Sequence, residues 1–154
     1  MSDMIFMKKA LDEARLAFEK GEVPIGAVIV RDGEVIASAH NLRETDRSAT
    51  AHAELLAIQK ACEVLGGWRL SGCELYVTLE PCPMCAGAII NSRIDRVIFG
   101  SKDEKAGACG SVMNLFAADF NHRPKLTVGV LEEECSSILK EFFASLREKK
   151  KKSI

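Results

Sequence analysis

The sequence predicts an α/β protein of three layers, in which helices cover both faces of a mixed five-stranded sheet. Three observations support this prediction. Apolar residues recur at helical spacing near both ends of the chain, a hairpin signal lies at residues 32–33, and a strand, a helix and a second strand follow one another between residues 75 and 100. A sheet in such a chain is buried between helices. With 47% hydrophobic residues, the 154 residues (1–154) have the size of a single domain.

The N-terminal part is predicted to form a helix and a β-hairpin. Apolar residues spaced three and four apart indicate an amphipathic helix that ends near Gly21, and its core-facing side is formed by Met4, Met7, Leu11, Ala14 and Phe18. Residues 25–30 are predicted to form a strand, residues 32–33 a two-residue turn, and residues 34–38 the returning strand. A polar loop over residues 41–49 follows.

The middle of the chain is predicted to hold a helix and then a strand–helix–strand unit. Residues 51–65 are rich in helix formers, and the glycine pair at residues 66–67 ends that helix. Residues 75–79, 83–91 and 96–100 are expected to form a strand, a short helix and a strand. Such a unit places its two strands parallel through a right-handed crossover.

The C-terminal part is predicted to contain one more strand and a long helix. A short apolar segment at residues 112–117 precedes the strand at residues 125–130. The helix is indicated by an apolar face made of Ile138, Leu139, Phe142, Phe143 and Leu146. Residues 147–154 form a basic tail in a chain whose net charge is −1, so this tail is either a solubilising terminus or a contact for a polyanion.

The cellular location follows from what the sequence lacks. No segment is long and apolar enough to cross a membrane, and the N-terminus has no apolar block like that of a signal peptide. We therefore expect a cytoplasmic protein with no membrane partner. Four of its six cysteines are then expected to be free thiols, namely Cys62, Cys73, Cys109 and Cys135.

Two short motifs carry residues that bind metals. One contains His52 and Glu54, and the other contains Cys82 and Cys85. Imidazole and thiolate are the ligands that zinc prefers, and three protein ligands leave a fourth position open for water. Three residues apart, the two cysteines share one face of a helix. The prolines around Cys82 fit the start of that helix, where exposed N–H groups favour a thiolate.

The spacing of His52 and Glu54 places a constraint on the fold. Residues two apart on a regular helix point in nearly opposite directions. The two side chains can therefore converge only if His52 lies at the very start of the helix. Thr50 is the predicted N-cap that would place it there.

This set of side chains fits a hydrolytic reaction. Zinc lowers the pKa of a bound water toward neutrality, which leaves Glu54 to accept and pass on a proton. A structural zinc site completed by Cys109, Cys73, His40 or His122 is the alternative, but it gives Glu54 no task. A redox pair formed by Cys82 and Cys85 would leave the His52 motif unexplained.

The two motifs together resemble the H-x-E and P-C-x-x-C signature of zinc-dependent base deaminases. Further stretches resemble the bacterial tRNA-specific adenosine deaminases over roughly residues 5–147, and they comprise residues 21–27, 39–44, 75–88 and 120–123. The resemblance implies a cytidine-deaminase-like fold and one zinc ion per subunit of a homodimer. It also implies conversion of adenosine to inosine at the wobble position of a tRNA anticodon, chiefly that of an arginine tRNA.

The resemblance also assigns residues to the substrate. Asn41 would hydrogen-bond the flipped-out adenine, although an Asn after a strand also stabilises turns. The backbone N–H of Ala53 would hold the oxygen that replaces the amine. The apolar walls would be Val23, Pro24, Ile25 and Leu79.

Contacts to the anticodon stem-loop are expected from the loop at residues 101–105, from the C-terminal helix and its tail, and from Asn121, His122 and Arg123. Asp103 is expected to accept a hydrogen bond from a ribose 2′-hydroxyl and so to exclude DNA.

Two other functions stay open. The zinc motifs are shared with deaminases of free bases and nucleosides, such as guanine and cytidine. The second open function is that of a non-catalytic tRNA-binding subunit, but such a subunit would not need the catalytic carboxylate of Glu54.

Overall fold

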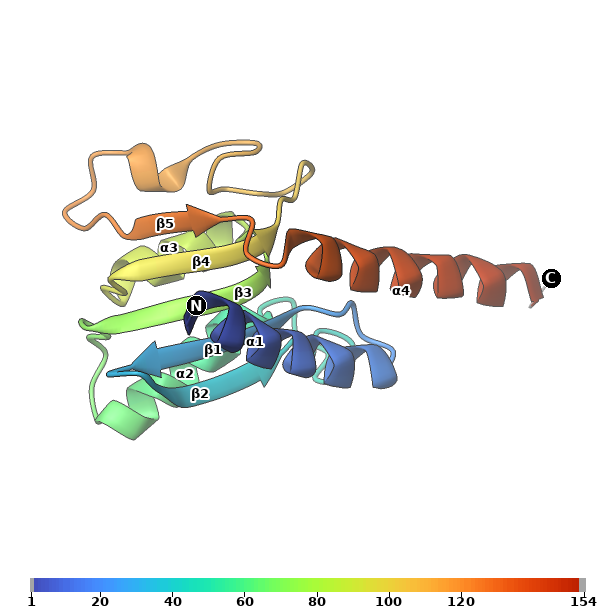
Figure 1. Ribbon diagram of the computed structural model, residues 1–154, viewed down its shortest axis with the longest axis horizontal. Coiled ribbons are helices and arrows are strands. Elements are labelled where there is room, and N and C mark those ends of the chain that lie inside the picture. Colours follow the sequence, from blue (N-terminus) through green and yellow to red (C-terminus); the bar gives the residue numbers. More distant parts are fainter. Residues whose placement is uncertain (1, 153–154) are drawn as a thin grey trace.

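A five-stranded mixed sheet forms the middle layer of the computed structural model, which describes residues 2–152 (Figure 1). Its strand order is β2-β1-β3-β4-β5. Strand β1 is antiparallel to both of its neighbours, whereas β3, β4 and β5 are parallel to one another. The strands are β1 (Gly26–Arg31), β2 (Glu34–His40), β3 (Cys73–Leu79), β4 (Arg96–Ser101) and β5 (Lys125–Val128). The predicted mixed sheet is therefore confirmed.

Helices cover both faces of the sheet, as predicted (Figure 1). Helices α1 (Ser2–Glu19) and α4 (Glu132–Lys152) lie on one face, and α2 (Ala53–Leu65) and α3 (Pro83–Asn91) lie on the other. A single 3-10 turn, η1 (Leu115–Ala117), packs against α3. The far end of α4 extends beyond the sheet (Figure 1). In residues 2–152, no helix has the length and apolarity needed to span a membrane.

The buried side of α1 differs from the predicted one. Met7 and Ala14 are buried as expected, but Met4 is 51% exposed, and Ala10 and Ala17 are buried in its place. The cause is a close approach of the helix to β1. The distance is so short that a Cβ on Gly26 would lie 1.9 Å from the carbonyl oxygen of Ala10. Small residues allow this approach where large ones would not.

The hairpin is the one the sequence predicts. Asp32 has φ 52° and Gly33 has φ 78°, which are the positive angles of a two-residue type I′ turn. Strand β2 continues to His40, two residues beyond the predicted end. The last strand, by contrast, ends two residues early, because Gly129 turns the chain with φ 91°.

The start of α2 corrects one expectation. The N-cap is His52 itself, with extended backbone angles, whereas the hydroxyl of Thr50 contacts that of Ser48. The prediction that Thr50 caps the helix is therefore wrong, while the predicted placement of His52 at the helix start is confirmed. The helix ends as predicted at Gly66, which has φ 72°.

Trp68 follows the glycine pair that ends α2 and is 52% exposed. The guanidinium groups of Arg69 and Arg93 lie over it, 4.4 and 5.7 Å from the ring centroid. The ring is thus covered by cations at the surface.

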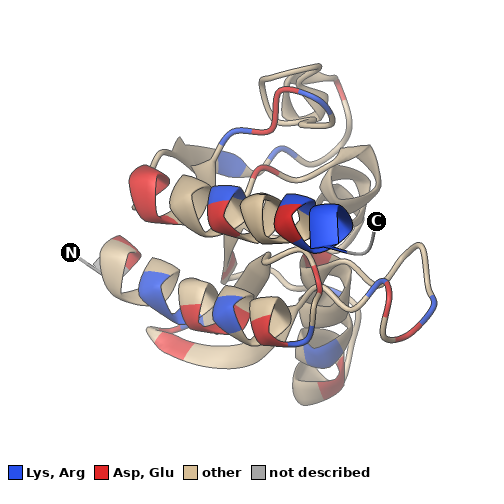
Figure 2. Cartoon of the chain, turned by 90° about the vertical axis from the view of Figure 1, so that its right-hand side faces the viewer, with Lys and Arg blue, Asp and Glu red and all other residues tan. Residues whose placement is uncertain are grey.

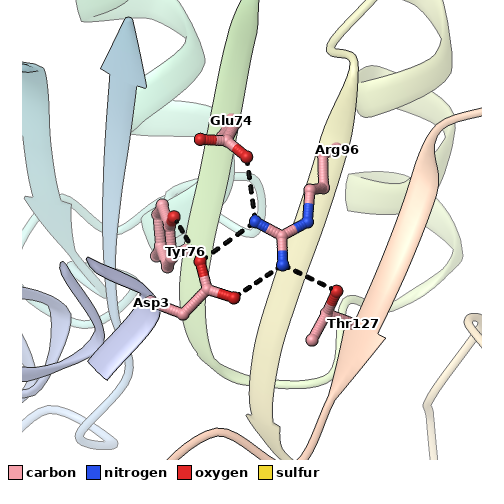
Figure 3. A network of polar contacts seen from close by, with 5 residues as sticks. All are labelled: Asp3, Glu74, Tyr76, Arg96 and Thr127. Carbon is pink, nitrogen blue, oxygen red and sulfur yellow. Dashed lines mark hydrogen bonds and ion pairs between the residues drawn. The ribbon is translucent and has the colours of Figure 1, made fainter. Parts of the chain in front are cut away.

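An ion-pair network joins α1 to the sheet (Figure 3). The Arg96 guanidinium on β4 donates to both carboxylate oxygens of Asp3, at 3.0 and 2.6 Å, and to Glu74 on β3 at 2.9 Å. It also donates to the hydroxyl of Thr127 on β5 at 2.9 Å. The Tyr76 hydroxyl donates to Asp3 at 2.8 Å. One guanidinium therefore links three strands and a helix.

We expect Asp3→Asn to show how much this network contributes to stability. The hydrogen bond from Arg96 holds the pKa of Asp3 below its usual value. The ionised carboxylate therefore stabilises the fold above the unfolded pKa of about 4, and this contribution is lost as the pH falls through the lower folded value. The variant should lose about 1–2 kcal/mol of unfolding free energy at neutral pH.

Urea denaturation at neutral pH and at the lowest pH at which the parent protein stays folded measures the difference. The matched control is Asp12→Asn, which changes an exposed carboxylate on the same helix. An equal loss for Asp3→Asn at both pH values would show that the charge of Asp3 is not what stabilises the fold.

Candidate metal centre and substrate pocket

The structure brings the three predicted metal ligands together. The ligand atoms of His52, Cys82 and Cys85 all lie within 4.8 Å of one another. Nδ1 of His52 is 3.7 Å from the sulfur of Cys82 and 3.5 Å from that of Cys85. Two thiols and an imidazole in this arrangement fit a metal ion such as zinc and leave a position for water.

Two helix N-termini create the cluster. His52 is the N-cap of α2, and Cys82 is the N-cap of α3, with extended angles of φ −76° and ψ 174°. Pro83 follows at the first helical position, where the missing N–H costs nothing. Cys85 lies in the first turn of the same helix. The unpaired N–H groups at both helix ends favour negative charge at this point.

The electrostatics of the cluster favour one thiolate. Hydrogen bonds, first from the Cys85 thiol and then from His52, lower the pKa of Cys82 to about 4. The same contact with Cys82 raises the pKa of Cys85, and the hydrogen bond to Cys82 raises the pKa of His52. The site is therefore prepared for a cation.

Glu54 lies beside the cluster without belonging to it. Its side chain is 4% exposed, in the first turn of α2. Burial raises its pKa to about 7. Glu54 lines the same pocket as His52 and Cys82, so it faces the space where a substrate would lie.

The alternative ligands lie elsewhere. In the part of the chain that the structure describes, the His52 cluster is the one group that could hold a metal. His40 contacts Glu13 and Lys20, and His122 contacts the carbonyl oxygen of Ile94. Cys73 and Cys109 are buried free thiols. A structural site with a fourth protein ligand therefore has no support, and the expectation of free thiols is confirmed for the described cysteines.

A pocket of about 900 Å³ opens over the cluster. Several predicted substrate residues line it, namely Val23, Ile25, Asn41, Ala53, Leu79 and Asp103. Pro24 is buried and does not line the pocket. Helix α4 also lines the pocket, through Glu132, Ser136, Leu139, Lys140 and Phe143. The sequence predicts Leu139 and Phe143 on the apolar face of this helix and does not single out the other three.

Asn41 is 3% exposed and already makes local contacts. Its Nδ2 donates to the carbonyl oxygen of Val23, and its Oδ1 accepts from the N–H of Arg43, both at 3.2 Å. The second contact is an Asx-turn, which is the turn-stabilising role weighed above. One amide hydrogen and one lone pair are left for a ligand.

The stretch with Asn121, His122 and Arg123 is not at this pocket. His122 Nε2 lies 2.7 Å from the carbonyl oxygen of Ile94, just before the start of β4. The pocket is at the other end of that strand, where Ser101 lines it. The structure therefore does not bring these three predicted residues to the metal centre.

Comparisons with known proteins find deaminases that match nearly the whole chain. The family model for MafB19-like deaminases matches residues 1–147. A tRNA-specific adenosine deaminase of Bacillus subtilis (strain 168) is 58% identical over 150 residues, covering 97% of this chain and 93% of the relative. One from Aquifex aeolicus (strain VF5) is 53% identical over 148 residues, covering 96% and 97%. A solved structure from a study of A-to-I editing by tRNA:A34 deaminases at the wobble position has a TM-score of 0.85 and 50% identity, covering 87% of this chain and 98% of that chain.

We expect His52→Ala to weaken metal binding by more than about 100-fold, because it removes one of three ligands. Metal content after dialysis against a competing chelator, measured by plasma mass spectrometry, tests this. The control is Cys109→Ala, a buried thiol near the cluster but outside it. An equal loss in that control would make Cys109 a fourth ligand and restore the structural zinc site.

Proposed function

We propose that the chain, which belongs to the MafB19-like deaminases and to the tRNA-specific adenosine deaminases, converts adenosine to inosine in tRNA. The proposed target is the wobble position of the anticodon, chiefly that of an arginine tRNA. One observation carries the proposal. A buried carboxylate, Glu54, lies beside a cluster of two thiols and an imidazole at a pocket whose rim is open to a large substrate.

The proposed cofactor is one zinc ion per subunit, held by His52, Cys82 and Cys85. Two sulfur ligands and one imidazole form the donor set that zinc prefers, and the described cluster offers no fourth protein ligand. When bound, zinc supplies a water molecule that ionises near neutral pH.

The residues around the cluster move the protons and hold the oxygen. Glu54 accepts a proton from the attacking water and delivers it to a ring nitrogen of adenine. It then accepts the remaining proton of the added hydroxyl and delivers it to the amine, which leaves as ammonia. The N–H groups in the first turn of α2 have no partner within the helix, so the N–H of Ala53 can hold the oxygen that replaces the amine. Burial of Glu54 keeps bulk water from competing for its proton.

The walls of the pocket would select the base. Asn41 offers its free hydrogen and lone pair to the adenine edge, between apolar walls from Val23, Ile25 and Leu79. A base reaches such a pocket only when it leaves the stack, which the unpaired nucleotides of an anticodon loop do at low cost.

Both cations and carboxylates line the rim of the pocket. Arg43, Lys102, Lys105 and Lys140 are the groups that can pair with a polyanion, and the carboxylates of Asp103, Glu104 and Glu132 lie among them. Helix α4 continues from this rim to four lysines in its last turn, and Figure 2 shows them at the C-terminal end of the helix. Basic groups in these positions can pair with the phosphates on either side of the bound nucleotide. We assign any contact of Asn121, His122 and Arg123 to RNA outside the pocket.

We also propose a homodimer that acts in the cytoplasm. The apolar side of α3 is largely used within its own core, since Ala86, Ile89 and Ile90 are buried. The nearby segment before η1 exposes Val112 at 59% and Met113 at 45%, and adjoining exposed apolar residues are common at interfaces. Sedimentation velocity would test this, with a mass near twice 16.8 kDa expected and a single-chain mass contradicting it.

We expect Glu54→Gln to slow deamination of an arginine tRNA by about 10²- to 10⁴-fold while metal content stays unchanged, because the amide cannot carry the proton. Inosine is measured as A-to-G conversion at the wobble position after reverse transcription. The control is Glu63→Gln, an exposed residue on the same helix. Ammonia released from free guanine or cytidine, with no inosine formed in tRNA, would instead support a deaminase of free bases or nucleosides.

We expect Asp103→Asn to lower the preference for RNA over DNA. Oδ1 of Asp103 accepts the N–H groups of Lys105 and Ala106 at 3.0 and 3.2 Å, and asparagine keeps that acceptor. Only the charge and the second acceptor oxygen are lost. The ratio of kcat/KM for an RNA stem-loop to that for its DNA counterpart should fall about tenfold, as for one charged hydrogen bond. The control is Glu104→Gln, also on the rim, and an unchanged ratio in Asp103→Asn would remove the proposed 2′-hydroxyl contact.

A further inference from the structure

Two buried carboxylates near the pocket have no part in the proposed chemistry. Glu22 is 1% exposed and Glu80 is 2% exposed. In the described part of the chain, neither forms an ion pair. Burying a carboxylate without a counter-ion is costly unless hydrogen-bond donors surround it. The donors that surround each of them come from one loop.

Glu80 is enclosed by the loop that follows β4. Its Oε1 accepts the N–H of Asp103 at 3.1 Å and the hydroxyl of Ser111 at 2.5 Å. Its Oε2 accepts the N–H groups of Cys109 and Ser111, at 3.0 and 3.1 Å. A Cβ on Gly107 would lie 2.3 Å from this carboxylate, so the loop closes on it only with glycine there. We name residues 102–111 the Asp103 loop.

Glu22 likewise accepts hydrogen bonds from a single loop, the one between β2 and α2. Its Oε1 accepts the N–H of Glu44 at 3.1 Å. Its Oε2 accepts both the N–H and the hydroxyl of Thr45, each at 2.6 Å. We name residues 42–50 the Arg43 loop, which separates Asn41 from His52.

The two loops carry three of the four cations on the rim of the pocket. Arg43 belongs to the first, and Lys102 and Lys105 belong to the second, as does Asp103. Both carboxylates also adjoin the pocket, because Glu80 itself lines it beside Leu79, and Glu22 directly precedes Val23 in the chain. Each one therefore connects a wall of the pocket to one of the loops that surround it.

We propose that Glu22 and Glu80 are positioning residues that fix the Arg43 loop and the Asp103 loop in the arrangement that receives the substrate. This proposal rests on the proposed function, because it takes the substrate to be an anticodon stem-loop. Loops held in place before binding lose less entropy when the RNA binds. Releasing them should therefore raise KM and leave kcat, which depends on Glu54 and the metal, nearly unchanged.

The test uses Glu22→Gln and Glu80→Gln in the full chain. Glutamine keeps the volume of each side chain, but its NH₂ group must face an N–H or O–H donor, because both oxygens of each carboxylate accept hydrogen bonds. Gly107→Ala is a third variant, which leaves Glu80 in place but puts a Cβ 2.3 Å from its carboxylate and 2.5 Å from the carbonyl oxygen of Asp103. The controls are Glu63→Gln, which is exposed, and Gly67→Ala, which has open space around it.

Amide hydrogen exchange, metal content and steady-state kinetics are measured on each protein. We expect faster exchange at Glu44 and Thr45 in Glu22→Gln alone, and at Asp103, Cys109 and Ser111 in Glu80→Gln and Gly107→Ala alone. KM for the stem-loop should rise about tenfold in all three, as for one or two lost hydrogen bonds, with kcat and metal content within about threefold of the parent.

Two outcomes would overturn the proposal. Faster loop exchange with unchanged KM would show that the loops do not position the substrate. A lower kcat together with lost metal in Glu80→Gln would show that Glu80 acts on the metal cluster. If the proposed function itself is wrong, the parent protein forms no inosine in tRNA. The KM values of the variants are then compared with that of the parent on whichever base or nucleoside the parent deaminates.

Discussion

The meeting of two helix N-termini at one point is the constraint on which the site depends. His52 can reach the thiols only because it precedes α2, and the thiols lie together because Cys82 is the N-cap of α3 and Cys85 lies in its first turn. Both helices lie on one face of the sheet, and each begins where the chain leaves the end of the sheet that holds the pocket. The free N–H groups at the two ends then favour the negative charge of thiolates and of a substrate oxygen. The topology of the sheet thus produces the electrostatics of the site.

Much of this could be predicted from the sequence because the signals were local. The hairpin follows from the residues of its turn, the parallel pair from the strand–helix–strand order, and the position of His52 from its two-residue spacing to Glu54. These predictions depend on neighbours in the chain, where spacing fixes geometry.

The remaining features depend on contacts between distant segments. The exposed Met4 and the buried Ala10 follow from the approach of α1 to Gly26, which no periodicity within the helix reveals. The distance of Asn121 from the pocket follows from the direction of β5, and the wall formed by α4 follows from its packing across the sheet. The roles of Glu22 and Glu80 could not be predicted either, because their partners lie more than 20 residues away.

The contact between Gly26 and Ala10 has a consequence for how the protein can vary. Any side chain at residue 26 would overlap the backbone of α1, whose Ala14 nitrogen lies 2.5 Å from the place of a Cβ. The strand could yield only by moving away from the helix, and Ile25, the next residue back, is part of the pocket wall. A helix that contributes no group to the reaction therefore restricts residue 26 to glycine, and through the backbone it fixes where Ile25 stands in the pocket wall. The position of that wall thus depends on a backbone contact that involves no substrate and no metal.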